Sequence, residues 1–589
     1  MRSGAKEPDK QHSRTHQSFL QGALILTAGI MAVKVIGAMF KIPLTWIITE
    51  DGLGYFNTAY HFYSPIHSLA TAGFPIAISR MVSECVAQKR YGDARRVHRV
   101  SIPIFITAGL CGTLIMLAGA PFYVQAIGNP EALPSMLALS PAILFGCLMA
   151  IYRGYYEGLR NMVPTAVSEI LEAVCKLVIG LTGALGVVWL GMREYHEKGT
   201  VFGEPMASES YAKSAVLPYA SAMAIVGVTI GSLVGFLYLF WKSKHAGYGI
   251  TAWELLQSPP TVSRSQTVRR LTRTAIPIGL GALAVNIAGL VDTTFLQTRI
   301  GQLMEENGAL LLSQYQGMIP EINQIENTVP NFLYGCYSQA LTLFMVVPSV
   351  TQAFGISALP SVTSAFAKKD QKALRSSVSS VLRITCLFCI PAGLGLSILA
   401  YPIAQMVFGA RASMTITARV LSILGIASIF AALSTPINSM LQAVGRVDLP
   451  VKLFLIGLTM KVTLNYFLSG VPEINIQGAA IGTLCCYLFL TVVGLMLLLR
   501  VTGIKIPLFS IAGKPVIGAV LCCAGAYVCQ SVLSQWLPIG IAAGAALVIA
   551  VIIYIFALWL LCAFTKTDFL MLPKGKKMIK ALEKIHFFG

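Results

Sequence analysis

The sequence predicts an all-α protein that crosses the membrane about fourteen times. Three observations carry this prediction: 55% of the 589 residues are hydrophobic, only 12% are charged, and long apolar runs recur from Phe19 to Phe564. A soluble domain carries about a quarter charged residues. Lipid cannot solvate an open backbone, so each run must pair its amides within a helix. The runs are too long and too uniformly apolar for the strands of a membrane barrel.

Fourteen apolar segments have about the twenty residues that a bilayer requires, or more. We place these helices at 19–47, 53–83, 99–127, 134–157, 161–191, 213–241, 270–299, 329–365, 377–408, 413–444, 447–469, 475–500, 511–534 and 537–564. The first run is too long for the apolar core of a signal peptide and has no small-residue cleavage site after it. We therefore expect it to be a retained first helix.

The basic residues of the loops support an even helix count. If the N-terminus is inside, every second loop should be rich in Lys and Arg. The loops assigned to the inside hold most of these residues, whereas those assigned to the outside hold only Arg193, Lys198, Lys213, Arg299 and Arg411. Both termini are therefore predicted to be cytoplasmic. The net charge of +19 is explained by these loops and the C-terminal end, so we expect no nucleic-acid partner.

Two stretches of sequence resemble each other and predict an internal repeat. Met31–Leu44 (MAVKVIGAMFKIPL) resembles Leu283–Leu296 (LAVNIAGLVDTTFL), which aligns Phe40 with Asp292. A second pair follows in the same order, GYFNTA from Gly54 and GCYSQA from Gly335. Helices 1–6 and 7–12 are thus predicted to be two lobes in parallel orientation, with the substrate path between them. The expected segments are a cytoplasmic tail (1–18), an N-lobe (19–241), a cytoplasmic linker (242–269), a C-lobe (270–500), two further helices (501–564) and a basic cytoplasmic tail (565–589).

Ionisable residues at bilayer depth are the candidate functional groups, because each costs about 2.5–3.5 kcal/mol on insertion and normally faces a cavity or a partner. The basic candidates for binding an anionic substrate are Lys34, Lys41, Arg80, Arg153 and Lys461. The candidates for coupling to an ion gradient are Asp292, Glu169, Glu172 and Lys176. The thirteen cysteines are scattered through apolar runs, which favours buried, reduced thiols. We predict no catalytic residue, no metal site and no cofactor.

Lys34 and Lys41 lie seven residues apart, on one face of the first helix, and that helix carries no acid. Two unpaired cations facing lipid are implausible, so this face should line a wet cavity that suits a phosphate or pyrophosphate. The alternative is that Lys34 pairs with Asp292 or with a glutamate of helix 161–191. Lys41 would then extend to the outer headgroups.

The remaining candidates also have structural interpretations. Glu172 and Lys176 have the spacing of an intrahelical ion pair, or they form a site for a coupling proton or cation. Asp292 has no cation near it in the sequence, so it is either a partner for Lys34 or an ion-coupling group. Arg80 and Arg153 lie close enough to the inside to be interfacial anchors.

Helices 1 and 2 carry a specific resemblance. Lys34 before Gly37, the turn Gly52-Leu53-Gly54-Tyr55 and the segment Gly73–Arg80 resemble the opening of the bacterial lipid II flippase (MurJ-like) and stage V sporulation protein B group. This group belongs to the multidrug/oligosaccharidyl-lipid/polysaccharide (MOP) exporter superfamily. The resemblance implies two six-helix lobes forming a V around a cationic cavity, with two extra helices grooved for a lipid tail.

The resemblance also implies roles for particular residues. Basic residues on helices 1 and 2 are essential in that group, and they match Lys34 and Arg80; Lys41 lies one place from a second arginine of the Gram-negative members. Those members also carry an arginine on helix 8, whereas Tyr334–Ala365 holds no basic residue, which favours the sporulation-type branch.

The predicted function is that of a flippase, not an enzyme. It would move an undecaprenyl-pyrophosphate-linked cell-wall precursor from the inner to the outer leaflet of the bacterial plasma membrane by alternating access. Its partners would be the lipid-linked oligosaccharide and the bilayer, and we expect a monomer. The sequence holds no GxxxxGK[ST], so direction would come from substrate consumption, membrane potential or a cation gradient.

Four alternatives remain open at this point. A multidrug/cation antiporter of the same superfamily would use acids such as Asp292. An exporter of another lipid-linked polysaccharide unit would differ only in the sugar. A membrane-embedded glycosyltransferase would be expected to show a DxD motif, and none is present. A scaffold without transport would not need charges at bilayer depth.

Overall fold

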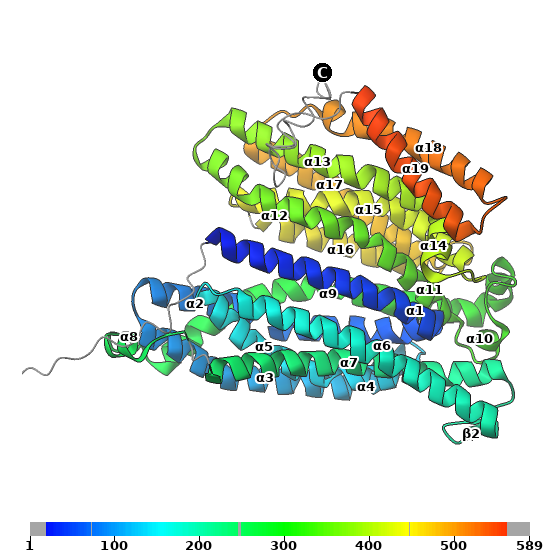
Figure 1. Ribbon diagram of the computed structural model, residues 1–589, viewed down its shortest axis with the longest axis horizontal. Helices are drawn as coiled ribbons and strands as arrows, with labels where there is room; N and C mark the ends of the chain where they lie inside the picture. The colour runs from blue at the N-terminus through cyan, green and yellow to red at the C-terminus, as the bar shows by residue number, and fades with distance from the viewer. Residues whose placement is uncertain (1–18, 72, 246–248, 447, 562–589) are drawn as a thin grey trace, which may run out of the picture.

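The computed structural model describes residues 19–71, 73–245, 249–446 and 448–561. Both predicted terminal tails, 1–18 and 565–589, lie outside these ranges. The described chain is helical throughout, apart from short connections and one two-stranded hairpin (Figure 1). Twelve helical segments within it are long and apolar enough to cross a membrane, which confirms a multi-pass all-α membrane protein. The count of about fourteen crossings stays a prediction.

The first part of the chain forms seven α-helices and the hairpin. The helices are α1 (Phe19–Thr71), α2 (Gly73–Ala87), α3 (Tyr91–Ala126), α4 (Leu133–Leu139), α5 (Pro141–Gly158), α6 (Val163–Lys198) and α7 (Glu209–His245). A 3-10 turn, Pro130–Ala132, precedes α4. Strands β1 (Thr200–Val201) and β2 (Glu204–Pro205) pair antiparallel between α6 and α7.

The second part of the chain begins after a connecting segment that contains the short helix α8 (Ala252–Leu256). Its helices are α9 (Arg264–Gln314), α10 (Glu321–Ile325), α11 (Val329–Phe344), α12 (Val346–Ala367), α13 (Gln371–Ile398), α14 (Ala400–Phe408), α15 (Met414–Ala443), α16 (Asp448–Leu468) and α17 (Gln477–Thr502). A π-helical turn, Phe509–Gly513, leads into α18 (Lys514–Leu533), and α19 (Ile539–Leu560) follows.

Several predicted boundaries differ from the structure. Predicted helices 19–47 and 53–83 run together as α1, which reverses at Thr49, where φ is 56° and ψ is −161°. One candidate membrane segment, Ala28–Ala87, therefore covers both. The predicted helix 270–299 is the middle of α9, which is not among the twelve candidate spans. The predicted outer loop 300–328 is largely helical, because α9 continues to Gln314 and α10 follows it.

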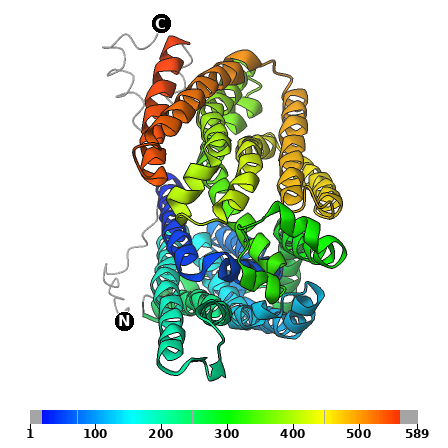
Figure 2. The same cartoon turned by 90° about the vertical axis from the view of Figure 1, so that its right-hand side faces the viewer.

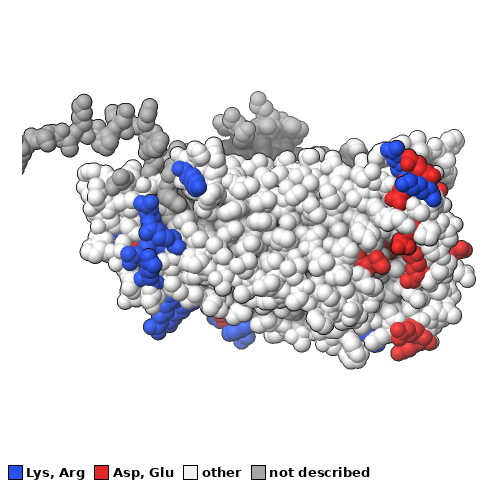
Figure 3. Space-filling model, turned by 90° about the horizontal axis from the view of Figure 1, so that it is seen from below, with Lys and Arg blue, Asp and Glu red and all other residues white. Residues whose placement is uncertain are grey.

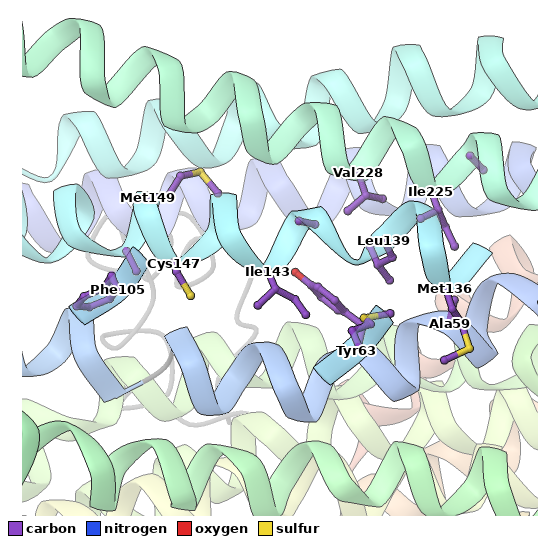
Figure 4. Packing of buried hydrophobic residues seen from close by; sticks show 14 of the residues in the cluster. Ala59, Tyr63, Phe105, Met136, Leu139, Ile143, Cys147, Met149, Ile225 and Val228 are labelled. Atoms are coloured by element: carbon purple, nitrogen blue, oxygen red, sulfur yellow. The ribbon is translucent and has the colours of Figure 1, made fainter. Parts of the chain in front are cut away.

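The helices gather into two groups, with α1 and α9 between them (Figures 1 and 2). The first group buries one apolar core, in which Tyr63 of α1 packs among residues of α4, α5 and α7 (Figure 4). Leu271 and Ala275, near the start of α9, belong to this core. Leu296 and Ile300, further along α9, belong to a second core with α11, α15 and α17. Helix α9 is therefore shared between the two groups.

Charged residues gather at the two ends of the helical array. On the face seen in Figure 3, Lys and Arg lie mostly at one end, Asp and Glu mostly at the other, and the band between is white. We call these the basic end, which holds α8 and the α2–α3 connection, and the acidic end, which holds α10 and the β1–β2 hairpin. A broad uncharged band between two charged rims is the surface expected of a protein that sits in a bilayer.

Candidate functional site

Lys34 and Lys41 of α1 have different surroundings. Lys34 is exposed, and its Nζ donates to Gln352 Oε1 (2.7 Å) and to the Ser349 carbonyl (3.4 Å) of α12. The pairing of Lys34 with an acid, the structural alternative for this residue, is therefore not what the structure shows. Lys41 is half-buried and lies within electrostatic range of Lys176. Among the residues that the structure describes, neither Lys41 nor Lys176 has a carboxylate at ion-pairing distance.

Lys176 of α6 lies against aromatic side chains of α1. Its Nζ lies 4.8 Å from the ring centroid of Phe40, 5.9 Å from that of Phe56 and 5.0 Å from that of Tyr60. It also lies 3.3 Å from the Tyr60 hydroxyl. An ammonium over aromatic faces is stabilised by the ring quadrupole, but its net charge is not cancelled. The rings of α1 therefore attract the Lys176 side chain without pairing it with an acid.

Glu172 does not form the intrahelical pair with Lys176 that the spacing suggested. It accepts instead from Arg153 of α5, with 3.1 Å between Nη2 and Oε2, and from the Ser232 hydroxyl (3.1 Å). Arg153 Nε also donates to Ser168 Oγ (2.9 Å). The charges of Arg153 and Glu172 thus compensate each other. Glu169 lies within electrostatic range of Arg153 and is half-buried.

Asp292 of α9 and Lys461 of α16 form a buried ion pair. Lys461 Nζ lies 2.8 Å from Asp292 Oδ2, and the two side chains are 9% and 6% exposed. Tyr337 donates to the same oxygen (3.2 Å), and Asn465 Nδ2 donates to the other (2.6 Å). Sequence analysis had selected both charged residues for separate roles. Helical periodicity could not predict that these two residues pair, because their helices are far apart in the sequence.

His61, on the returning half of α1, connects the two groups of helices. It lies within electrostatic range of both Lys41 and Lys461. Its imidazole fills the space where a side chain at Gly289 of α9 would begin. We call Lys41, His61 and Lys176 the central basic cluster, and Lys461 lies beside it as the partner of Asp292. Sequence reasoning missed His61, because a single histidine in an aromatic segment gives no signal of its neighbours.

Arg80 lies apart from these contacts. It is exposed on α2, and it is within electrostatic range of Glu84, whose carboxylate pairs with Arg270 of α9 at 2.6 Å. Arg80 is thus beside a contact between α2 and the start of α9, where Leu271 and Ala275 belong to the core of the first group. The structure does not bring it together with the central basic cluster through any hydrogen bond or ion pair of the described residues.

A polar network around Glu50 ties α1 to the second group of helices near the acidic end. Glu50 is buried at the reversal of α1, and its carboxylate lies 3.2 Å from Arg411 Nη1. It also accepts from Ser413 Oγ (2.8 Å) and Gln339 Nε2 (3.2 Å). Beside it, Asp51 accepts from Asn323 (2.9 Å). These residues were missed, because charges at a predicted helix end look like ordinary loop residues.

The arrangement is suited to binding an anion between two groups of helices. It offers cations from α1, α6 and α16, and two of them lack an acid among the described residues. The described residues contain no group of three His, Cys, Asp or Glu placed to hold a metal ion. Cys386 and Cys389 have CxxC spacing, but both are buried in α13.

Comparison with known proteins gives two family matches and several relatives. The polysaccharide biosynthesis protein family matches residues 19–192, and the MatE family matches residues 335–467. The lipid II flippase MurJ of Bacillus subtilis (strain 168) is 22% identical over 497 residues, which are 82% of this chain and 83% of that protein. Stage V sporulation protein B of the same organism is 22% identical over 471 residues, which are 79% of this chain and 80% of that protein.

A solved structure of a lipid II flippase MurJ, in an inward closed conformation, has the same fold. It superposes with a TM-score of 0.61 at 13% identity and covers 91% of this chain and 98% of that one. The family resemblance inferred from helices 1 and 2 is confirmed by these matches. Within the multidrug/oligosaccharidyl-lipid/polysaccharide exporter superfamily, the chain is similar to the lipid II flippase and to stage V sporulation protein B.

Proposed function

We propose that this protein is a flippase that moves an undecaprenyl-pyrophosphate-linked cell-wall precursor of the lipid II type from the inner to the outer leaflet by alternating access. The central basic cluster is the observation that carries the proposal. Lys41 and Lys176 lie within electrostatic range of each other where α1 and α6 meet, and neither has a carboxylate partner in the described chain. Cations held at bilayer depth are costly unless they serve a ligand, and a pyrophosphate is a ligand of matching charge.

Flipping needs no bond chemistry, so the protein is not an enzyme in this proposal. It needs a polar path for the headgroup and a side opening for a lipid tail that can stay in the bilayer. Charged groups inside the protein lower the barrier by replacing the water around the pyrophosphate. No cofactor is required. Direction would come from consumption of the product outside, from the membrane potential or from a cation gradient.

The charged ends suggest an orientation. Cytoplasmic loops of membrane proteins are enriched in Lys and Arg, so the basic end would face the cytoplasm and the acidic end the outside. This orientation agrees with the prediction that both termini are cytoplasmic in a bacterial plasma membrane. The Glu50 network near the acidic end would then close the outer side in this conformation. The protein would work as a monomer, with the lipid-linked oligosaccharide and the bilayer as its partners.

Lys34 and Arg80 would act earlier on the path of the headgroup. Both are exposed, and Lys34 contacts α12 of the opposite group of helices. Arg153 and Lys461, the other two residues predicted to bind substrate, already have acidic partners, Glu172 and Asp292. In our proposal these two pairs stabilise the lobes.

A second candidate function is the export of another lipid-linked polysaccharide unit. The match of residues 19–192 to the polysaccharide biosynthesis protein family favours it, because that segment contains Lys41 and Lys176. The MatE match of residues 335–467 raises a multidrug/cation antiporter as well. A cationic drug would need a free acid, however, and the Asp292 carboxylate already accepts from Lys461.

The test is to deplete the protein in its own host and to treat spheroplasts with a membrane-impermeant agent that cleaves lipid-linked wall precursor at the outer face. We expect depletion to protect the precursor and the wild-type chain to restore cleavage, whereas Lys41→Ala restores little. If the precursor stays cleavable throughout depletion, lipid II is not the cargo. The same assay with other undecaprenyl-linked glycans then decides between the two candidates.

A further inference from the structure

The internal repeat predicted from the sequence has matching contacts in the structure. The alignment pairs Gly54 with Gly335, and therefore Glu50 with Asn331, four residues earlier in each copy. A side chain at Gly54 would overlap Asn331, and one at Gly335 would overlap the backbone of Glu50. Each glycine thus packs against the residue that lies four positions before the glycine of the other copy. Such reciprocity is what a two-fold relation between two copies produces.

The same relation makes Lys176 and Lys461 counterparts. Each lies 13 residues beyond the first residue of its helix, α6 or α16. Lys176 contacts Phe40, and Lys461 contacts Asp292, the residue that aligns with Phe40. The next turn repeats the match. A side chain at Gly180 would meet the Phe40 ring at 2.9 Å, and Asn465 donates to Asp292 at 2.6 Å.

One difference between the copies decides whether each lysine has an acidic partner. In the second copy the aligned position is Asp292, whose carboxylate compensates Lys461. In the first copy it is Phe40, whose ring attracts the Lys176 ammonium without neutralising it. Tyr337 and Phe56 align as well. Tyr337 donates to Asp292, whereas Phe56 presents its ring to Lys176.

We propose that Lys176, which sequence analysis grouped with the ion-coupling candidates, is the diphosphate ligand of this protein. Lys461, its counterpart, is kept out of that role by Asp292. The inference rests on the proposed function, because it names the residue that holds the charged part of the headgroup. Lys41 supplies the second cation, since it lies within electrostatic range of Lys176 and has no carboxylate partner among the described residues.

The test measures binding of inorganic pyrophosphate to the purified full-length protein in detergent, as a change in Tm against chloride at equal ionic strength. The wild type should show a saturable rise. Lys176→Met keeps an apolar contact with the rings but removes the charge, and it should raise the half-saturation concentration about tenfold or more. The double variant Asp292→Asn/Lys461→Met removes the compensated pair and should keep the wild-type response.

Phe40→Asp places the acid of the second copy into the first and should also abolish the response, although Lys176 is retained. Phe40 is buried, so placing an acid there can prevent folding. If Phe40→Asp does not fold, the response of Lys176→Met alone decides the test. The inference is overturned if the wild type gives no saturable rise, if Lys176→Met responds as the wild type does, or if the double variant loses the response. Lipid II flipping by Lys176→Met vesicles separates this inference from the proposed function. If Lys176→Met flips lipid II as fast as the wild type does, only the role of Lys176 is refuted. If the wild type binds pyrophosphate but does not flip lipid II, only lipid II as the transported substrate is refuted.

Discussion

At the scale of single residues, the charges at bilayer depth fall into compensated pairs and uncompensated lysines. Composition and hydropathy sufficed to find these residues, because any ionisable group in an apolar run is conspicuous. Their partners could not be found in that way. Helical periodicity gives the face on which Asp292 lies, but not that Lys461, on a helix far along the chain, faces it. The i,i+4 spacing of Glu172 and Lys176 even suggested the wrong partner, because Arg153 competes for the carboxylate.

The Asp292–Lys461 pair makes a stability prediction. Removing one partner leaves a buried charge uncompensated, so Lys461→Met and Asp292→Asn should each destabilise the protein, by about 3–5 kcal/mol for the loss of a buried partner. The double variant should recover much of this loss. The measurement is the Tm of the purified protein in one detergent.

An exposed pair provides the matched control. Asp448 bridges Arg446 and Lys452 with side chains that are 45% to 70% exposed, so Asp448→Asn should leave the stability nearly unchanged. Equal losses for Asp448→Asn and Asp292→Asn, or a double variant that is no more stable than the singles, would contradict the buried ion pair.

Glu50 makes a prediction about closure near the acidic end. Glu50→Gln weakens the attraction to Arg411, so this end should open more often. Cys336 is a built-in reporter, because it is fully buried in α11 and lies within electrostatic range of Glu50. With the other cysteines replaced, an impermeant maleimide added outside should label Cys336 faster in Glu50→Gln than in the parent.

Glu209→Gln is the control for that experiment, since it removes an exposed acid that pairs only locally with Lys213. Labelling of Cys336 should not change in this variant. If Glu50→Gln and Glu209→Gln give the same labelling rate as the parent, the Glu50 network does not hold this end closed.

At the scale of elements, apolar length predicted where helices exist but not where they bend or join. Residues 19–47 and 53–83 were expected as two helices, and the structure joins them through a reversal at Thr49. Helix α9 was expected to end at 299, whereas it continues to Gln314. Polar residues such as Glu305 and Glu306 suggested a loop. An exposed polar helix satisfies its own backbone equally well, so hydropathy could not distinguish the two.

Close approach between elements makes a prediction at Gly335 of α11. A methyl group there would overlap the Glu50 backbone, which cannot rotate away as a side chain can. Gly335→Ala should therefore destabilise this conformation, by the roughly 1–3 kcal/mol typical of overpacking. The Tm of the purified variant is the measurement.

Gly301 of α9 is the matched control, because nothing lies within 4 Å of the position that its Cβ would occupy. Gly301→Ala should raise stability slightly, since alanine loses less backbone entropy than glycine in a helix. We therefore expect Gly335→Ala to lower the Tm and Gly301→Ala to raise it. A stabilising Gly335→Ala would show that α1 and α11 do not pack as closely as the structure indicates.

At the scale of the whole molecule, the all-α membrane class and the superfamily were both predictable from sequence. Apolar runs of bilayer length and the enrichment of Lys and Arg in every second loop are strong signals. The amino-acid sequence of helices 1 and 2 supplied the resemblance to the family. The assembled site was not predictable. Lys41, His61 and Lys176 come together only because α1 folds back on itself and α6 packs on the resulting hairpin. Those are packing events between distant segments, which no local pattern encodes.

The most direct test of the central claim uses the purified protein in vesicles that contain fluorescent lipid II. Dithionite added outside quenches only the outer leaflet, so flipping appears as quenching beyond half of the signal. We expect the wild type to exceed that half, and Lys41→Met and Lys176→Met to fall towards protein-free vesicles. Wild-type vesicles that stop at half would contradict the lipid II flippase account. Full quenching by both lysine variants would contradict the assignment of the headgroup to the central basic cluster.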